Sequence, residues 1–252
     1  MAAINDNLQA VTARIQNAAK VAGRDPATVR LLAVSKTQPH DAILQAYAAG
    51  QRSFGENYVQ EALEKQAALT EGVKTGVQSS VQALPKALTP GKLEWHLIGP
   101  LQANKTRVVA AAFDWVHSID RAKIARRLSE ARAAHAEALN VLIQVNVSGE
   151  PTKSGVAPGD VAGLAHEVAA LPRLCLRGLM AIPEPTDDVE KQRVRFREIR
   201  ELFDRLVGDG LVLDTLSMGM SLDLESAIAE GATMVRIGTA IFGERKIVGA
   251  VT

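Results

Sequence analysis

The stretch Leu31-Leu32-Ala33-Val34-Ser35-Lys36 is the part of the chain from which both the fold and the function can be approached. Apolar and small residues run directly into a lysine, and Thr37-Gln38-Pro39 follow it. This pattern predicts a short buried strand that ends in a proline-bearing turn. A lysine at such a strand end is partly desolvated, which lowers the pKa of its amine and favours attack on a carbonyl. The alternative is an ordinary strand-terminal lysine whose ammonium group lies in water.

Short apolar segments of this kind alternate with longer helical patterns along the chain. The predicted strands are residues 30–35, 52–55, 93–98, 114–118, 141–147, 174–181, 213–218 and 233–237. The predicted helices are residues 3–22, 40–49, 57–69, 101–112, 121–138, 159–170, 187–207 and 221–230. Such alternation is typical of βαβ units and a parallel sheet. Eight strands in about 250 residues predict a (β/α)8 TIM barrel, a single α/β domain over residues 1–252 with an extra N-terminal helix.

A doubly wound open sheet is the alternative fold, but the glycine-rich dinucleotide fingerprint that would support it is missing.

One stretch interrupts the alternation of strands and helices. Residues 71–92 are rich in Gly, Ser, Thr, Lys and Pro, so we expect a long excursion between the predicted helix 57–69 and the third strand.

Composition narrows the functional classes. The 252 residues are 47% hydrophobic and 23% charged, and the net charge is +1, which gives no electrostatic case for nucleic acid or a membrane surface. No apolar run approaches the roughly 20 residues that span a bilayer, so we expect a cytoplasmic protein. The one cysteine, Cys175, excludes an internal disulfide, and its neighbours Leu174 and Leu176 predict a buried, inert thiol.

Polar or glycine-rich groups follow six of the predicted strands. In barrels of this type the active chemistry lies at the carboxyl ends of the strands, and a scaffold without a ligand would not need polar groups at so many of them. The groups are Lys36, Gly55-Glu56-Asn57-Tyr58, His96 with Gly99-Pro100, Asn146 and Ser148, Ser217-Met218-Gly219-Met220-Ser221, and Arg236-Ile237-Gly238-Thr239.

The ends of the seventh and eighth strands predict a phosphate site. Gly219 permits close approach of the backbone, Ser217 and Ser221 offer hydroxyls, and the helix that follows can bind an anion at its first amides. Gly238-Thr239 supplies a second small-residue turn beside them, where barrels of this type frequently bind phosphate. The structural alternative is a tight turn with Ser221 as the helix N-cap.

Arg236 is predicted to point into the barrel. Alternation places it on one face of its strand, with Val235 and Ile237 on the other, toward the outer helices. A buried charge needs a partner, which is either an internal carboxylate or an electron-rich ligand atom. His96 and His117 also lie on predicted strands, where we expect satisfied core histidines. The basic run over 191–205 predicts a solvated helix face with i,i+4 ion pairs.

The sequence resembles the pyridoxal phosphate homeostasis protein family, single-domain relatives of the barrel half of alanine racemase. The matching segments span residues 30–243 in order. They are Ala33-Val34-Ser35-Lys36, Phe54-Gly55-Glu56-Asn57-Tyr58, Trp95-His96-Leu97-Ile98-Gly99-Pro100-Leu101-Gln102, Gln144-Val145-Asn146-Val147-Ser148, Lys153-Ser154-Gly155, Arg177-Gly178-Leu179-Met180, Leu216-Ser217-Met218-Gly219-Met220-Ser221 and Met234-Val235-Arg236-Ile237-Gly238-Thr239.

The resemblance implies a bound cofactor, pyridoxal 5′-phosphate (PLP), and no metal. Lys36 would hold it as a Schiff base, Arg236 would face its pyridine nitrogen, and Asn57 would line the pocket. The phosphate would be held by Ser217 with the neighbouring amide of Met218, and by Gly238-Thr239. One departure from the family pattern is Leu222, where an acidic residue is common.

The family is regarded as non-catalytic, which implies a carrier or buffer of cellular PLP, with PLP-dependent apoenzymes as partners, and we expect a monomer. An arginine at the ring nitrogen keeps it unprotonated and weakens the cofactor as an electron sink. Racemases with that arrangement use a tyrosine from an added domain, and this chain has only Tyr47 and Tyr58. The alternatives are a slow amino-acid racemase with Lys36 as its base, and a cofactor-free Schiff-base aldolase.

Overall fold

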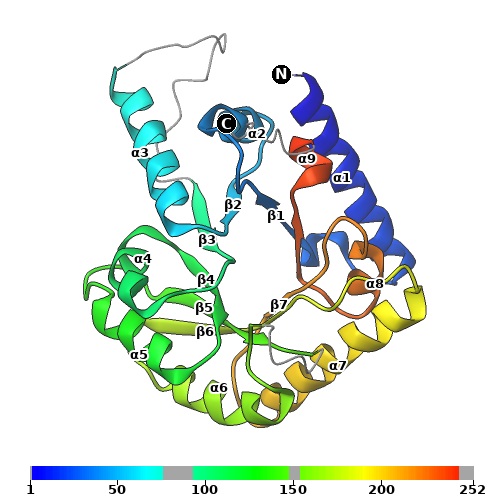
Figure 1. The fold of residues 1–252 in the computed structure, drawn as a ribbon. Helices are drawn as coiled ribbons and strands as arrows, with labels where there is room; N and C mark the ends of the chain where they lie inside the picture. The colour runs from blue at the N-terminus through cyan, green and yellow to red at the C-terminus, as the bar shows by residue number, and fades with distance from the viewer. Residues whose placement is uncertain (1, 76–92, 148–153, 244–252) are drawn as a thin grey trace, which may run out of the picture.

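The computed structural model describes residues 2–75, 93–147 and 154–243. Eight parallel strands pair in chain order and close into a barrel, so the TIM-barrel prediction is confirmed (Figure 1). The strands are β1 Arg30–Val34, β2 Ser53–Glu56, β3 Glu94–Leu97, β4 Trp115–Ile119, β5 Leu139–Val145, β6 Leu174–Ala181, β7 Thr215–Ser217 and β8 Met234–Ile237. Each lies within a few residues of its predicted range, because the apolar runs mark the buried strands.

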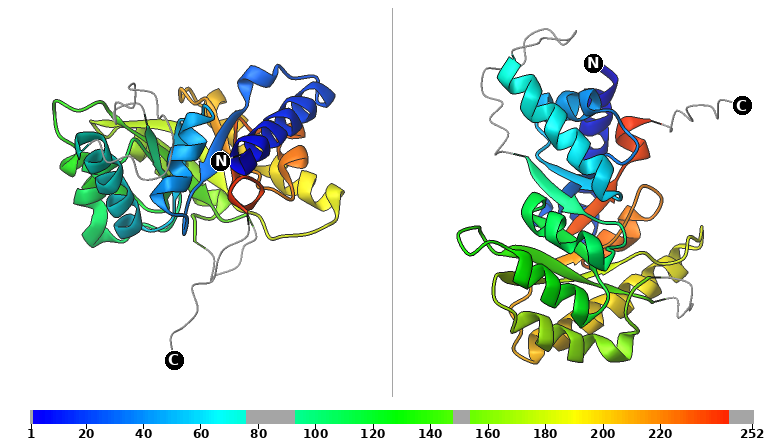
Figure 2. Two further views of the ribbon diagram at one scale, coloured as in Figure 1. Left: turned by 90° about the horizontal axis from the view of Figure 1, so that it is seen from above. Right: turned by 60° about the vertical axis from the view of Figure 1, so that its left-hand side comes forward.

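Helices surround this barrel. They are α1 Ala2–Val21, α2 His40–Ala48, α3 Val59–Thr75, α4 Thr106–Ala112, α5 Ala122–Ala131, α6 Val161–Ala169, α7 Val189–Gly208, α8 Leu224–Ala229 and α9 Thr239–Phe242. The helix α1 has no preceding strand and packs across α2, α8 and α9, outside the junction of β1 and β8 (Figures 1 and 2). Its apolar residues Leu8, Val11 and Ile15 are buried there, which confirms the amphipathic N-terminal helix.

The core has two layers. The larger one lies between the strands and the helices, and Phe54, Phe113 and Phe196 are fully buried in it. The smaller one fills the barrel itself with Trp115, Leu142 and Met180. A barrel of eight strands has an interior just wide enough for side chains, so this inner layer makes the barrel a packed body rather than a pore.

Two helices end at different residues from those predicted. The helix α5 stops at Ala131 instead of residue 138, because Arg132 adopts an extended backbone. Its guanidinium donates to the carbonyls of Ala110 and Phe113 at the end of α4, and to that of Glu137. The helix α3 continues through Thr75, so residues 71–75 of the predicted excursion are helical; residues 76–92 lie outside the described part of the chain.

One prediction about the surface was wrong, and another was confirmed only in part. Cys175 is exposed, because β6 alternates and turns this residue away from the core while Leu174 and Leu176 are buried. Three ion pairs of the basic face of α7 are made with Glu230 at the end of α8. Arg193, Arg197 and Arg200 all approach its carboxylate, which is only 2% exposed. The pairing is therefore tertiary, although Arg200 also approaches Asp204 four residues on, at 4.0 Å.

Within the described residues, no helix is both long enough and apolar enough to cross a membrane.

Gly178 is predicted to be irreplaceable, whereas Gly163 is not. Gly178 lies in β6 at a register shift against β5, with a φ of 147°, and a Cβ there would meet the Thr215 carbonyl oxygen at 2.0 Å. Gly178→Ala should therefore lower the free energy of unfolding by about 2–5 kcal/mol. Gly163→Ala, in open space on α6, should raise it by up to about 1 kcal/mol. Urea unfolding followed by circular dichroism measures both, and equal changes in the two variants would contradict the close approach.

Candidate functional site

A cavity of about 360 Å³ lies at the carboxyl ends of the strands. Its size falls in the range of small-molecule sites, and it combines an apolar wall with a few polar groups. Five of the seven residues predicted from the sequence line it: Lys36, Asn57, Arg236, Gly238 and Thr239. The other lining residues are Val34, Ile98, Ile182, Pro183, Pro185, Thr186, Asp187, Gln192, Met220, Ser221, Leu222 and Asp223.

A second cavity of about 320 Å³ adjoins the first and shares Asn57, Ile98 and Ile182 with it. Gln144 adds a polar side chain to this part. The shared wall depends on close backbone packing, because a Cβ on Gly99 would lie 2.2 Å from the Asn57 carbonyl oxygen. Gly99 is therefore required for the loops after β2 and β3 to meet.

A third cavity, of about 510 Å³, lies on the outer side of the barrel between α3, α4 and α5. Its charged groups are already engaged in structural contacts. Arg132 donates to carbonyls, and Asp114 accepts the Trp95 amide at 2.7 Å. The smaller cavity at the strand ends is the better candidate because its polar groups converge on open space.

Helix α3 fixes the backbone on both sides of Lys36. The ammonium group of Lys65 donates to the Ser35 carbonyl oxygen at 2.7 Å, just before Lys36. The Glu61 carboxylate accepts the amide of Thr37 at 2.5 Å, just after it. Thr37 has a φ of 62°, which is unusual for a β-branched residue and so needs such support. Lys65 and Glu61 also pair with each other at 2.7 Å, so one helix holds the whole turn.

Glu56 completes this charge cluster from the end of β2. One carboxylate oxygen accepts from the Ser35 hydroxyl at 2.6 Å and from Lys65 at 2.7 Å, while the other has no hydrogen-bond partner within the described residues. Burial raises the pKa of Glu56, and the charge of Lys65 opposes that rise. Sequence reasoning missed Lys65 and Glu61, because only the rotation of α3 about its axis shows that they turn inward.

Arg236 points into the barrel, as its strand alternation predicted, and is 4% exposed. In the described part of the chain its donors reach oxygens that carry no full charge. They are the Ser217 carbonyl at 2.5 Å, the Ser217 hydroxyl at 2.8 Å and the Ala181 carbonyl at 2.8 Å. Burial lowers the pKa of Arg236 to about 10, and the charge of Asp223 opposes this. The arginine thus remains a cation at the wall of the cavity.

Ser217 and Met218, the other two predicted residues, are fully buried, and neither is among the residues that line the cavity. The Ser217 hydroxyl is engaged with Arg236 and His117 inside the barrel. Ser221 lines the cavity instead. It is not the N-cap of α8, since that position belongs to Asp223, whose carboxylate accepts the Met220 amide at 2.5 Å. Asp223 therefore brings an acidic group to this loop, next to the position where Leu222 departs from the family pattern.

The two core histidines are fully buried, as predicted. His117 contacts a partner through each ring nitrogen, His96 at 2.9 Å and the Ser217 hydroxyl at 3.0 Å. His96 has one such contact, and its Nε2 lies 3.6 Å from Glu94, which is beyond hydrogen-bond distance. Within the described residues, no cluster of three acidic, histidine or cysteine side chains could hold a metal ion.

Comparison with known proteins agrees with this geometry. Residues 7–246 match the family described as alanine racemase, N-terminal domain. The pyridoxal phosphate homeostasis protein of Pseudomonas aeruginosa is 58% identical over 245 residues, which cover 97% of this chain and 97% of the relative. The chain therefore has the barrel of the alanine racemase class.

Solved structures give the same result. PipY from Synechococcus elongatus, solved with PLP bound, is 36% identical, has a TM-score of 0.77, and is matched over 95% of this chain and 100% of that one. Alanine racemase from Clostridium difficile is 14% identical with a TM-score of 0.67, matched over 96% of this chain and 56% of that one, and shows the fold alone. Within its class, the chain belongs to the pyridoxal phosphate homeostasis protein family.

The Lys65–Glu56 pair predicts a pH-dependent loss of stability. Lys65→Met should lower the free energy of unfolding by about 3–5 kcal/mol at pH 8, because Glu56 is left as a buried charge without its cation. The pKa of Glu56 is raised in the folded protein and should rise further in the variant. The cost of its charge is present above that folded pKa and disappears as the pH falls below the ordinary value of 4.5. The loss should therefore be smaller at pH 5 than at pH 8.

Urea unfolding of the wild type and the variant at both pH values measures this difference. The matched control is Lys65→Met combined with Glu56→Gln, which removes the charge and should recover much of the stability at pH 8. A loss that is the same at both pH values, or no recovery in the double variant, would contradict the role given to the pair.

Proposed function

We propose that this protein binds pyridoxal 5′-phosphate in the cavity at the strand ends and serves intracellular PLP homeostasis. The observation that carries the proposal is that an amine, a guanidinium and a hydroxyl, from Lys36, Arg236 and Thr239, line one cavity of suitable size. The names of the relatives and the PLP-bound structure of PipY support it.

The lining residues fit the parts of this cofactor. The Lys36 amine is a nucleophile for its aldehyde carbon, and we propose that it holds the cofactor covalently. The Arg236 guanidinium would donate to the ring nitrogen, and Asn57 lines the same cavity as the lysine. Val34 and Ile98 supply apolar contact for the ring. When bound, the cofactor provides an electrophilic carbonyl and an electron sink.

We assign the phosphate to Ser221, Gly238 and Thr239, which all line the cavity. This assignment replaces Ser217 with Ser221, because the Ser217 hydroxyl already contacts Arg236 and His117. The backbone of Gly238 packs closely against the end of β1, since a Cβ there would lie 3.1 Å from the Val34 carbonyl oxygen.

A carrier is favoured over a racemase. Neither of the two tyrosines is among the residues that line the cavity: Tyr47 is 5% exposed beneath Arg52, and Tyr58 is 59% exposed. No tyrosine of this chain is therefore placed as a second base, and Arg236 disfavours protonation of the ring nitrogen. We infer that bound PLP is passed to PLP-dependent apoenzymes rather than used. A chiral assay with each common amino acid distinguishes the two candidates, because turnover of about 1 per second or more would support the racemase.

The first prediction of this proposal concerns the covalent link. Lys36→Ala should abolish the borohydride-reducible attachment of PLP while the far-ultraviolet circular dichroism stays unchanged, because the backbone of this turn is held by Lys65 and Glu61 rather than by the Lys36 side chain. The control is Lys123→Ala at an exposed position of α5. Mass spectrometry of the reduced protein measures the attachment, and an attachment that persists in Lys36→Ala would refute the assignment.

The second prediction concerns the phosphate. Pyridoxal should bind more weakly than PLP to the wild type, because it lacks the anionic group. Ser221→Ala combined with Thr239→Ala should weaken PLP binding by a few kcal/mol, since hydrogen bonds to charged groups contribute about 1.5–3 kcal/mol each. The same double variant should bind pyridoxal as the wild type does. Fluorescence titrations give the four dissociation constants, and a parallel loss for both ligands would show that these hydroxyls do not hold the phosphate.

A further inference from the structure

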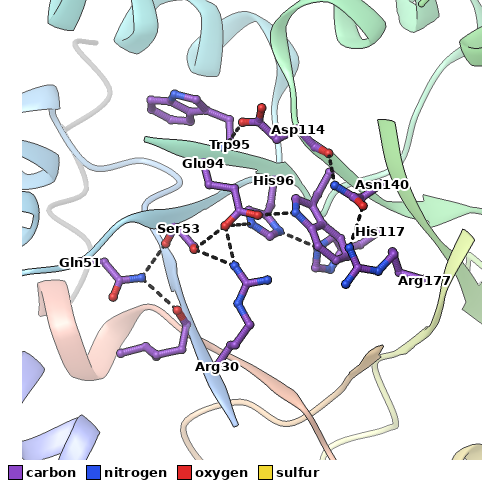
Figure 3. Close-up of polar contacts among 12 residues, drawn as sticks. Arg30, Gln51, Ser53, Glu94, Trp95, His96, Asp114, His117, Asn140 and Arg177 are labelled. Carbon is purple, nitrogen blue, oxygen red and sulfur yellow. Dashed lines mark hydrogen bonds and ion pairs between the residues drawn. The ribbon is translucent and has the colours of Figure 1, made fainter. Parts of the chain in front are cut away.

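The interior of the barrel contains a row of polar side chains that reaches Arg236 from the opposite end. His96 on β3, His117 on β4 and Ser217 on β7 are each 0% exposed. The contacts are 2.9 Å between His96 Nδ1 and His117 Nε2, 3.0 Å between His117 Nδ1 and Ser217 Oγ, and 2.8 Å between Ser217 Oγ and Arg236. Beyond His96 the row ends at Glu94, 3.6 Å away (Figure 3).

Glu94 is a firmly held anion. Its carboxylate accepts from Arg30 at 2.5 Å and from the Ser53 hydroxyl at 2.8 Å, and Trp115 also donates to it. Burial opposes its charge, but the contact with His96 and the charge of Arg30 lower the pKa of Glu94 well below its ordinary value. The row thus has the carboxylate of Glu94 at one end and the guanidinium of Arg236 at the other.

Hydrogen bonding gives this row a direction. Arginine only donates, so Ser217 Oγ accepts from Arg236 and can direct its own proton to His117 Nδ1. Burial lowers the pKa of both histidines, so each ring carries one N–H at neutral pH. If His117 carried its proton on Nδ1, its Nε2 would need the proton of His96 Nδ1, and the bare His96 Nε2 would face Glu94. The unprotonated Nε2 of His96 and the carboxylate of Glu94 would then be two acceptors facing each other. A proton on Nε2 of both rings avoids this repulsion.

We propose that His96, His117 and Ser217 form a hydrogen-bonded chain of fixed direction that leads from Arg236 toward Glu94, and that they are positioning residues for the guanidinium at the cofactor ring. The proposal rests on the assignment of Arg236 to the ring nitrogen. Every donor in the chain points away from Arg236, so the acceptor ends of the dipoles face the cation and stabilise it where burial disfavours its charge. A guanidinium held in this way can only donate to the ring nitrogen, which then carries no proton.

The direction of the chain is measurable without the cofactor. Long-range ¹⁵N–¹H correlation spectra of the ¹⁵N-labelled full-length protein distinguish the two neutral tautomers and the imidazolium. We expect both rings to be in the neutral Nε2–H tautomer at pH 7. Spectra of the His96→Asn and His117→Asn variants identify which signals belong to which ring. The charged groups that face the two rings are Glu94, Asp114, Arg30 and Arg236. An Nδ1–H tautomer or an imidazolium at either ring would overturn the proposal.

The effect on the cofactor is tested by Ser217→Ala, which breaks the chain next to Arg236. We expect it to weaken binding of PLP and of pyridoxal by the same factor, about tenfold or more, because a hydrogen bond to a charged group is lost near the ring rather than near the phosphate. The absorbance of bound PLP, titrated with pH, should also shift. His117→Gln, which keeps hydrogen-bonding groups beside Ser217, should have a smaller effect.

The matched control is Ser118→Ala, which removes a buried hydroxyl from β4 that has no hydrogen-bond partner in the described residues. It should leave both dissociation constants and the pH titration unchanged. A loss confined to PLP in Ser217→Ala would restore Ser217 as a phosphate ligand and overturn the positioning role, as would an unchanged spectrum in that variant. If the wild type bound no PLP, the proposed function would fail, whereas the tautomers would still test the chain itself.

Discussion

The positive charge of Arg236 inside a closed barrel is the constraint on which the polar interior depends. A guanidinium loses its hydration when it is buried. In the described part of this chain, Arg236 donates hydrogen bonds to the Ser217 and Ala181 oxygens rather than to a carboxylate. From Ser217, the polar side chains of His117 and His96 extend toward Glu94 at the other end of the barrel interior. Trp115, Leu142 and Met180 fill the barrel beside this row, since Trp115 stacks on His96 and Met180 pairs in register with Ser217. The interior therefore combines a polar row, which accommodates the charge of Arg236, with an apolar cluster packed against that row.

The fold was readable from the sequence because its main signal is local. Each strand is a short apolar run, and the closed order of eight strands follows from their number and their alternation with helices. Five residues that line the candidate cavity could also be predicted from the sequence, since the carboxyl end of a parallel strand has a known place in a barrel. Arg236 could be given a direction because one strand alternates with a period of two.

The remaining features depend on contacts between distant segments. The sequence shows Ser217 and Ser221 as equivalent hydroxyls, and only the barrel wall separates the one that meets Arg236 from the one that lines the cavity. Helix α5 was predicted too long because the end of a helix at Arg132 is decided by the carbonyls of α4. Lys65 was not singled out from the sequence, although it is 6% exposed and pairs with Glu56 from another element.

The clamp on either side of Lys36 has a kinetic consequence. Because α3 holds both the preceding carbonyl and the following amide, the Cα of Lys36 is tied to the packed scaffold rather than to a moving loop. The amine then samples the cavity by rotation about the bonds of its own side chain, which takes place in picoseconds to nanoseconds for accessible residues. Loop rearrangements are slower by orders of magnitude. For the covalent attachment proposed above, the timing would therefore be set by diffusion of the carbonyl compound into the cavity and by the chemistry at the amine, with no conformational delay imposed by the backbone.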